Sequence, residues 1–439
     1  MNSRNRSLLI SSAVAGLVCG VALTQQQVKA ATEDPAASSE KVVEVQAPGS
    51  KTETDANGNN SNGNNSNGIN DTDASSSNSN SGSEENSSTN ESTEVDKNGI
   101  NTQSTEAKQH VPVKAGQGSE IIDQGTWGTS KWEYTREGDD YVLHLHEGTL
   151  GLPKWYSGKF TDVGIGQLNE NFQNQLTKIK FDSGVIANQN SSGLFACLTK
   201  LTSIEGLANL DTSNVMNMRL MFNNCSNLTE LDLSKFNTAK VTNMRAMFLG
   251  CTNLKSLDLS SFDTSAVTDM TTMFTDCKAL ANLDISNFNT SNVINMRDMF
   301  GSCKNLEELD LSNFETSEVI DMDAMFLFCS GLKKINLNHF DTSNVTDMSS
   351  MFEGCSSLKS INVSNFNTSN VTNMSFMFDS CSSLKTIDVS NFDTSKVTGM
   401  PWMFNGCHSL MNIDLSNFNT SNVTDMYSMF NGCWNLTDL

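Results

Sequence analysis

The chain of 439 residues carries a formal net charge of −22 at pH 7 and contains 11 cysteines. So acidic a protein is repelled by phosphate groups and by anionic membrane surfaces, which argues against a nucleic-acid partner. The sequence also lacks the His-Glu-x-x-His, Gly-x-Ser-x-Gly and phosphate-loop motifs of common enzyme classes. We therefore expect no enzyme, with no catalytic residue, metal or cofactor.

Residues 1–30 have the pattern of a secretory signal peptide. Arg4 and Arg6 precede an apolar stretch over residues 8–23, and Val28-Lys29-Ala30 fits a cleavage site. The apolar stretch is too short, and too often interrupted by Ser and Gly, for a good membrane span. We expect a secreted, extracellular protein at the cell surface, without a transmembrane helix.

Residues 31–118 are dominated by Asn, Ser, Gly, Thr, Glu and Asp, as in the run at residues 59–65. Because this segment has almost no apolar side chains to bury, its composition predicts a disordered spacer. A spacer of this kind would hold the folded part away from a cell wall. The alternative is a tolerated tail with no role.

Residues 119–200 predict a β-rich N-terminal cap. Trp127 and Trp132 belong to an aromatic-rich stretch that contrasts with the rest of the chain. Residues 141–146 alternate between the two faces of a strand, and residues 133–135 form the expected hairpin partner. The repeats that follow need an atypical first unit to cover their open core, and this segment supplies it.

Two further stretches of the cap are similar to the repeats. The pattern from Leu176 to Phe181 predicts a degenerate first strand, and residues 194–197 read as a shortened Met-Phe-x-x-Cys element. His144 and His146 lie on one face of the predicted strand. They form either a solvated pair or two ligands of a metal site, although no third ligand is identifiable.

Residues 201–439 repeat a unit of 26 residues nine times. A fixed period of this length is typical of a solenoid, in which each unit stacks on the next. The period is visible in the cysteines: Cys225, Cys251, Cys277, Cys303, Cys329, Cys355, Cys381, Cys407 and Cys433.

Each unit contains two apolar patterns. Leu254, Leu257 and Leu259 indicate a short strand, because leucines alternate with a polar residue. Residues 345–355 place Val, two Met, Phe and Cys three or four positions apart, which predicts a helix of about two turns. Asn, Asp or Gly precedes this helix as its N-cap, and Pro401 fits its first turn. The predicted fold is an α/β solenoid of parallel strands and short helices.

The Leu-x-x-Leu-x-Leu pattern followed by Val-Thr-x-Met-x-x-Met-Phe-x-x-Cys resembles the BspA-type leucine-rich repeats of bacterial surface proteins. The resemblance covers about half of the chain and rests on nine copies in register. It implies a leucine-rich-repeat fold and a location at the cell surface. It also implies adhesion, since some such proteins bind host extracellular-matrix proteins.

The pattern reaches Leu439 without a closing unit. An uncovered strand edge would be unstable, so we expect the solenoid of residues 201–439 to be truncated at the C-terminus, or to lack its C-terminal cap and any anchor. No sorting motif or apolar tail indicates how the protein is anchored.

The cysteine and methionine columns are expected to serve the core. Each Cys stands at the end of an apolar stripe, where a thiol packs as a small apolar group. Secretion would permit disulfides, but side chains stacked in one column point in the same direction. The two Met columns, which begin at Met218 and Met221, are likewise expected to be core rather than metal ligands.

A column of acidic side chains follows the predicted strands and faces outward. As a surface it suits a basic or polar partner, and its carboxylates could alternatively hold Ca²⁺ or simply be solvated beside neighbouring serines. The candidate residues are Asp232, Asp258, Asp284, Asp310, Asp388 and Asp414.

Outward aromatic side chains are the strongest candidates for binding a ligand. Phe376 and Trp402 occupy the same position in neighbouring units, so their rings should stack, and Tyr427 lies close to them. Exposed aromatic residues are enriched in binding hot spots. The alternative is that they pack against a further part of the protein.

These observations favour a secreted surface protein that adheres to a host matrix protein or to another cell. One alternative is a structural spacer in a wall or biofilm with no specific partner. Another is that the chain is the binding module of a larger enzyme.

Overall fold

The computed structural model describes residues 119–155 and 162–439, which belong to one compact unit. The predicted signal peptide of residues 1–30 and the predicted spacer of residues 31–118 lie outside the described residues. The described part of the chain consists of a β-rich N-terminal region and a stack of repeated coils, which we describe in turn.

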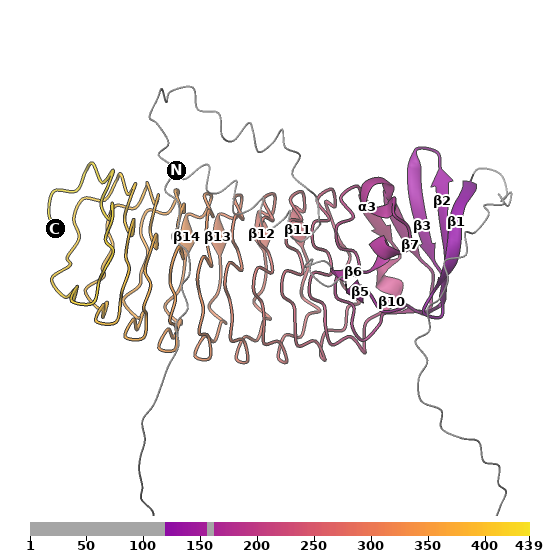
Figure 1. Ribbon diagram of the computed structural model, residues 1–439, viewed down its shortest axis with the longest axis horizontal. Helices are drawn as coiled ribbons and strands as arrows, with labels where there is room; N and C mark the ends of the chain where they lie inside the picture. Colours follow the sequence, from indigo (N-terminus) through magenta and orange to yellow (C-terminus); the bar gives the residue numbers. More distant parts are fainter. Residues whose placement is uncertain (1–118, 156–161) are drawn as a thin grey trace, which may run out of the picture. The chain divides into compact units, whose positions relative to one another are not determined.

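A five-stranded sheet begins the described chain (Figure 1). In spatial order its strands are β1 (Ser119–Trp127), β2 (Ser130–Glu137), β3 (Asp140–Leu145), β7 (Lys178–Phe181) and β9 (Ser203–Glu205). The first three strands pair antiparallel, and β7 and β9 then add in parallel. Tyr134 pairs with Leu143, which confirms the predicted hairpin, and β7 confirms the strand predicted near residue 179.

Shorter elements accompany this sheet. The strands β4 (Gly148–Thr149), β8 (Val185–Ile186) and β10 (Leu210–Asp211) form a second sheet, and β5 (Lys154–Trp155) pairs with β6 (Asp162–Val163). Within the described residues the helices are short: η1 (Ile165–Gln167), α3 (Phe172–Gln175) and η2 (Leu207–Asn209). Phe172 of α3 is buried against Trp132 and Tyr134, with ring centroids 6.1 Å and 4.7 Å apart.

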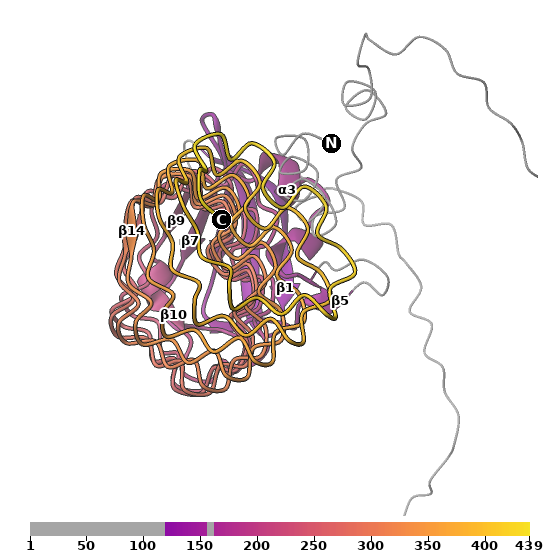
Figure 2. The ribbon, with the colours of Figure 1, turned by 90° about the vertical axis from the view of Figure 1, so that its left-hand side faces the viewer.

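The rest of the chain forms coils that stack one behind another (Figures 1 and 2). Parallel pairing joins β11 (Ser256–Leu257) to β12 (Asn282–Leu283) and β13 (Glu308–Leu309) to β14 (Lys334–Ile335). A second line of parallel bridges connects the Asn, Asp or Gly before the first Met of each coil, from Asn217 to Asp425. The fold is therefore a β-rich repeat with parallel pairing.

The short helix predicted in each repeat is wrong. Residues 210–439, all of which are described, contain no helix. The backbone N–H groups of Met244, Ala246 and Phe248 donate to carbonyl groups of the next coil at 2.8–3.1 Å. The N–H groups of Met247 and Leu249 donate to the carbonyl three residues earlier, so this segment is a series of tight turns.

Left-handed backbone at two positions explains why the helix does not form. The residue before the second Met has φ between +51° and +60°, and the residue before Cys has φ between +54° and +78°. Glycines such as Gly250 and Gly354 occupy the second position, because they adopt positive φ without steric cost. Helices also need 8–10 Å between their axes, whereas neighbouring coils repeat the same side chain every 5.5–5.7 Å.

The residue before the turns acts through its side chain. Asn217 accepts a hydrogen bond from the N–H of Arg219, at 3.0 Å, and the equivalent Asn or Asp does the same in other coils. In one coil the acceptor and the donor are both missing, because Gly399 has no side chain and Pro401 has no N–H. The predicted helix N-cap is thus a turn-forming acceptor.

The core consists of columns of identical side chains, as predicted from the period. Phenylalanine rings from Phe222 to Phe430 stack in a single ladder, with centroids 5.5–5.7 Å apart and planes within 11°. Phe195 extends the ladder at 4.9 Å from Phe222, which confirms residues 194–197 as a shortened repeat element. The Val, Met, Leu and Cys columns are buried beside it as far as Leu410, whereas Met426 in the coil after residue 420 is 45% exposed.

Buried threonines form a polar ladder within this apolar stack. Thr290 is fully buried; its hydroxyl donates to the carbonyl of Glu315 and accepts from the N–H of the same residue, both at 2.8 Å. The same arrangement joins Thr238 to Asp263 one coil on. Because each hydroxyl is satisfied in both roles, burying this column does not leave a polar group without a partner.

Candidate binding surfaces of the solenoid

The predicted aromatic cluster is present in the structure. The rings of Phe376 and Trp402 stack with centroids 4.7 Å apart and planes at 11°, and Tyr427 meets Trp402 edge-on at 5.0 Å. Tyr427 is 66% exposed, whereas Phe376 and Trp402 are half-buried. We call these three residues the aromatic cluster.

The backbone positions these rings. Phe376 and Trp402 stand at the left-handed position before the second Met, with φ of 60° and 55°. Their N–H groups donate to the carbonyls of Pro401 and Tyr427 in the next coil, both at 2.9 Å. Successive coils therefore place the rings in one column outside the core. Tyr427 belongs to the adjacent column, which explains why it meets Trp402 by its edge.

The predicted acidic column is exposed, and its carboxylates are engaged within their own coils. Each of the six aspartates accepts the backbone N–H of the Ser two residues later, at 2.9–3.1 Å. Hydrogen bonds from the hydroxyl and from the N–H of that serine, the hydroxyl being the larger cause except at Asp310, hold the pKa of Asp232, Asp258, Asp284, Asp310, Asp388 and Asp414 below the ordinary value of 3.8. The carboxylates of this column thus stabilise turns within their own coils, and the side chains remain exposed to solvent.

Calcium binding by this column finds no support in the geometry. The described part of the chain contains no group of three or more His, Cys, Asp or Glu side chains arranged to hold a metal ion. The acidic column and the aromatic cluster are also separate features. The carboxylates bond to serines of their own coils, whereas the aromatic rings contact one another.

Sequence reasoning missed a groove of about 730 Å³ on the turn segments of the coils. Its lining includes Arg219, Arg245 and Arg297, the apolar Leu220 and Leu249, and, at the far end, Phe376 of the aromatic cluster. The three arginines occupy the same position in their coils. Their register was a signal in the sequence, because every arginine after residue 136 falls in that position.

Charges in the groove change along its length. Arg297 pairs with Asp323 of the next coil at 3.1 Å, and Asp323 also accepts the hydroxyl of Ser349 at 2.8 Å. Burial and the neighbouring carboxylates of Asp276 and Asp323 raise the pKa of Asp298 well above its ordinary value. The groove is therefore basic on the side of Arg219 and carries acidic groups beyond Arg297.

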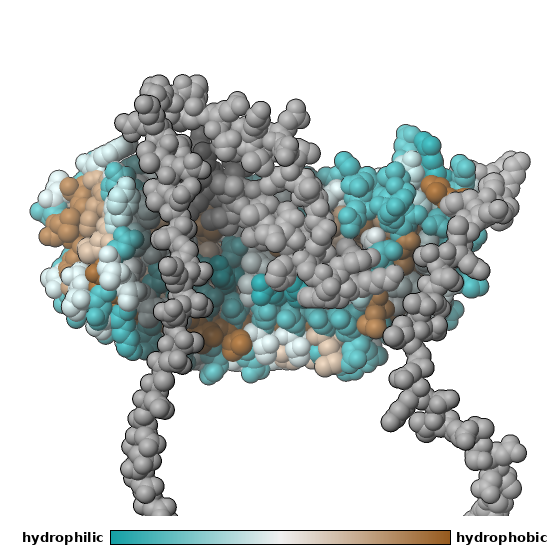
Figure 3. Space-filling model, in the orientation of Figure 1, coloured by the Kyte–Doolittle hydropathy of each residue, from teal (hydrophilic) through white to brown (hydrophobic). Residues whose placement is uncertain are grey.

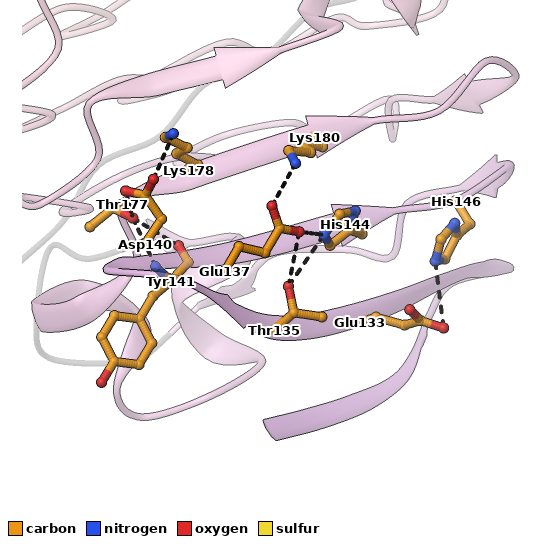
Figure 4. Close-up of polar contacts among 10 residues, drawn as sticks. All are labelled: Glu133, Thr135, Glu137, Asp140, Tyr141, His144, His146, Thr177, Lys178 and Lys180. Atoms are coloured by element: carbon orange, nitrogen blue, oxygen red, sulfur yellow. Dashed lines mark hydrogen bonds and ion pairs between the residues drawn. The ribbon is translucent and has the colours of Figure 1, made fainter. Parts of the chain in front are cut away.

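The two histidines of the N-terminal sheet lie beside carboxylates, His144 beside Glu137 and His146 beside both Glu133 and Asp182; Figure 4 shows the contacts with Glu137 and Glu133. Nε2 of His144 lies 2.9 Å from Glu137, which also pairs with Lys180 at 2.8 Å. Nδ1 of His146 lies 2.7 Å from Asp182. The imidazoles are thus part of polar networks on the face of the sheet, and the geometry does not bring a third metal ligand to them.

The cysteine column is a row of buried free thiols, as predicted. Cys225 to Cys407 are buried, Cys433 is half-buried, and none of these nine is in a disulfide. Each Sγ donates to the carbonyl of a Phe in the preceding coil at 3.0–3.3 Å, or of Phe195 for the first. Burial raises the pKa of Cys251 and of Cys329 to about 12.

Apolar surface gathers at the coil that contains residue 439 (Figure 3). Met426, Tyr427 and Trp434 are exposed there, and Trp434 stacks on His408 with centroids 4.2 Å apart. In the described ranges 119–155 and 162–439, no helix has both the length and the apolar character needed to cross a bilayer.

The comparisons with known proteins concern the coils. The family described as "Mycoplasma protein of unknown function, DUF285" matches residues 189–308, 257–335, 279–361 and 328–438. No curated protein matches the chain. The four overlapping matches reflect the repeat and together span more than half of the sequence, so the chain belongs to this DUF285 family of repeat proteins.

Proposed function

We propose that this protein is a secreted or cell-surface adhesin of the BspA type, whose coils bind a protein partner through the aromatic cluster. The expected partner is a host extracellular-matrix protein. One observation carries the proposal: Phe376 and Trp402 form a parallel stack at 4.7 Å outside the core, and Tyr427, 66% exposed, lies against it.

The geometry of the cluster suits binding. Stacked rings fixed by inter-coil hydrogen bonds lose little conformational freedom when a partner binds, and aromatic side chains dominate the energetics of interfaces. Neighbouring coils carry small or polar residues at the position of Phe376, such as Ser350 and Ala324. The cluster is thus a local departure from the repeat, which is where a specific contact is expected.

Binding of the full chain to a panel of immobilised matrix proteins tests the proposal. We expect saturable binding to at least one of them, weakened roughly thirtyfold in the double variant Phe376→Ala/Trp402→Ala, as for residues of a hot spot. Trp434→Ala is the matched control, because Trp434 is 79% exposed and lies outside the cluster. Equal loss in the control would contradict a specific role of the cluster.

A wall or biofilm spacer without a partner predicts a different result. The unmodified chain would then bind none of the matrix proteins, and the double variant would behave like the wild type. The location is tested separately by sequencing the N-terminus of the mature protein, which we expect to begin after Ala30.

A further inference from the structure

The arginines of the coils are concentrated in the groove. Arg219, Arg245 and Arg297 line it, and no other arginine follows residue 136 in a chain of net charge −22. Arg245 is exposed, and the side chain of Arg297 is 57% exposed. A basic row on so acidic a protein is unlike its surroundings, and guanidinium groups favour carboxylate ligands through paired hydrogen bonds.

The dimensions of the groove suit an extended polypeptide. Between the coil of Arg219 and the coil of Phe376 lie six repeat steps of about 5.5 Å, or about 33 Å in all. An extended chain rises about 3.3 Å per residue, so about ten residues match this length. Alternate side chains of such a segment point the same way at about 6.6 Å, about 1 Å more than one step between coils, and the arginines stand one step and two steps apart.

The lining supplies partners for a peptide backbone and an apolar floor. Thr272, Asn295 and Ser350 line the groove with polar side chains, of which the Ser350 hydroxyl donates to Glu353 at 2.8 Å and the Asn295 amide oxygen accepts from Thr271 at 2.9 Å. Leu220 and Leu249 pack with Ala246 in a small cluster apart from the main core. An extended segment could therefore place some of its N–H and C=O groups against polar side chains, above apolar side chains that are already buried.

The distribution of charge in the groove favours an acidic peptide over a uniformly anionic polysaccharide. Asp321 and Asp323 line the same groove one coil beyond Arg297, and Asp323 already pairs with Arg297 at 3.1 Å. A uniformly anionic polysaccharide long enough to fill the groove would pass the carboxyl group of Asp321 and would compete with Asp323 for Arg297, and like charges brought together in an interface are costly. A peptide avoids this cost, because its acidic residues can be confined to one half.

We propose that this groove binds an extended segment of a protein partner, with acidic side chains over Arg219, Arg245 and Arg297 and an apolar or aromatic side chain near Phe376. The site shares Phe376 with the aromatic cluster, but it takes its charged contacts from the arginines. Substitution of the arginines, which are remote from Trp402 and Tyr427 in the sequence, separates the two proposals.

Fluorescence anisotropy with labelled decapeptides tests the site on the full chain. The first probe carries Glu at three alternate positions of one half and Trp near the other end, and the second carries Gln in place of each Glu. We expect the Glu peptide to bind at least about tenfold more tightly, with an affinity that falls as salt rises. The variant Arg245→Gln/Arg297→Gln should bind it about tenfold more weakly, without a change for the Gln peptide.

Arg136→Gln is the matched control, because Arg136 lies in β2 outside the groove. It should leave both affinities unchanged, and circular dichroism should show all variants folded. Equal binding of the two peptides, or an unaltered affinity in the double variant, would overturn the proposal. Tighter binding of a heparin oligosaccharide than of the Glu peptide would overturn it as well, since the site would then favour a uniform polyanion.

Discussion

The N-terminal sheet and the coils use polar side chains in opposite ways. In the sheet, each polar contact joins residues of different kinds once, as His144, Glu137 and Lys180 do. In the coils, one contact recurs: Thr238, Thr264 and their equivalents each bond to the backbone of the next coil. The residue type at a position of the sheet is therefore determined by its particular neighbours. At a position of the coils it is determined by the equivalent residues of the adjacent coils.

This difference indicates which columns of the coils can vary in sequence and so carry a binding site. Columns that hold coils together must keep one type of residue, because each member packs on a copy of itself. The columns of Arg219 and Leu220 do not follow this rule, since Arg, Thr, Asp, Ser, Phe and Trp all occur in them. Both candidate binding surfaces, the groove and the aromatic cluster, lie on these two columns.

The largest expected difference between the two regions is a loss of folding stability of the coils at alkaline pH. Burial raises the pKa of the Cys251 and Cys329 thiols from 9.0 to about 12. The folded coils keep these thiols protonated, while the unfolded chain releases the protons above pH 9. Stability is therefore full below pH 9 and falls as pH rises toward 12, by about 1.4 kcal/mol per pH unit for each thiol.

Urea denaturation between pH 7 and pH 11 measures this loss. Other groups also titrate in this range, so the slope is compared with that of Cys251→Ala/Cys329→Ala. The variant should be less stable at pH 7 but should lose less stability per pH unit above pH 9. Parallel curves for the two proteins would show that the thiols do not account for the alkaline sensitivity.

The next effect concerns the phenylalanine ladder. Phe300 is fully buried between Phe274 and Phe326, each with its centroid 5.7 Å away. Phe300→Ala removes contacts with both neighbouring coils and should lower the free energy of unfolding by about 3–5 kcal/mol. Tyr427→Ala, at an exposed ring, should change it by less than about 1 kcal/mol. Similar losses in the two variants by urea denaturation would contradict the ladder's role.

A smaller effect is expected from the threonine ladder. Thr290→Val keeps the shape of the side chain but leaves the N–H and C=O of Glu315 without their partner, which should cost about 1–3 kcal/mol. Thr268 offers a control: its hydroxyl also bonds to a backbone carbonyl, that of Thr242 at 3.3 Å, but the residue is exposed. Thr268→Val should be nearly neutral. A neutral Thr290→Val would mean that water replaces the lost bonds.

The sequence predicted the columns better than the backbone between them. A period of 26 residues alone brings Phe352 over Phe378, whatever the conformation of the coil. The turns were mistaken for helices because both place apolar side chains three and four residues apart. The glycines before Cys, such as Gly250 and Gly406, were the available sign of left-handed backbone, but a helix end favours glycine as well.

Of the two candidate surfaces, one was predicted from the sequence and the other was not. The stack of Phe376 on Trp402 followed from their register, and the structure shows it. The groove was missed because the residues that line it differ from coil to coil, so no repeated pattern marks them. The shared register of Arg219, Arg245 and Arg297 was visible in the sequence. That these arginines line a groove could be seen only once the conformation of the turns was known.

The smallest effect is expected in the N-terminal sheet. The hydrogen bond from Lys180, with a further one from His144, holds the pKa of Glu137 below its ordinary value of 4.5. A lowered pKa in the folded state gives stability that is present above pH 4.5 and is lost as pH falls further. Because the pair is partly exposed, Glu137→Gln should cost less than about 1 kcal/mol at pH 7.

The comparison of pH 7 with pH 3 sharpens this prediction. The wild type and Glu137→Gln should differ at pH 7, and the difference should be smaller at pH 3, because below pH 4.5 the carboxyl group of the unfolded wild type takes up its proton before that of the folded protein. Glu120→Gln, at an exposed position of β1, should follow the wild type at both values. If Glu137→Gln instead cost as much as Phe300→Ala, a single polar pair would matter to the sheet as much as a whole column matters to the coils, and the contrast between the two regions would fail.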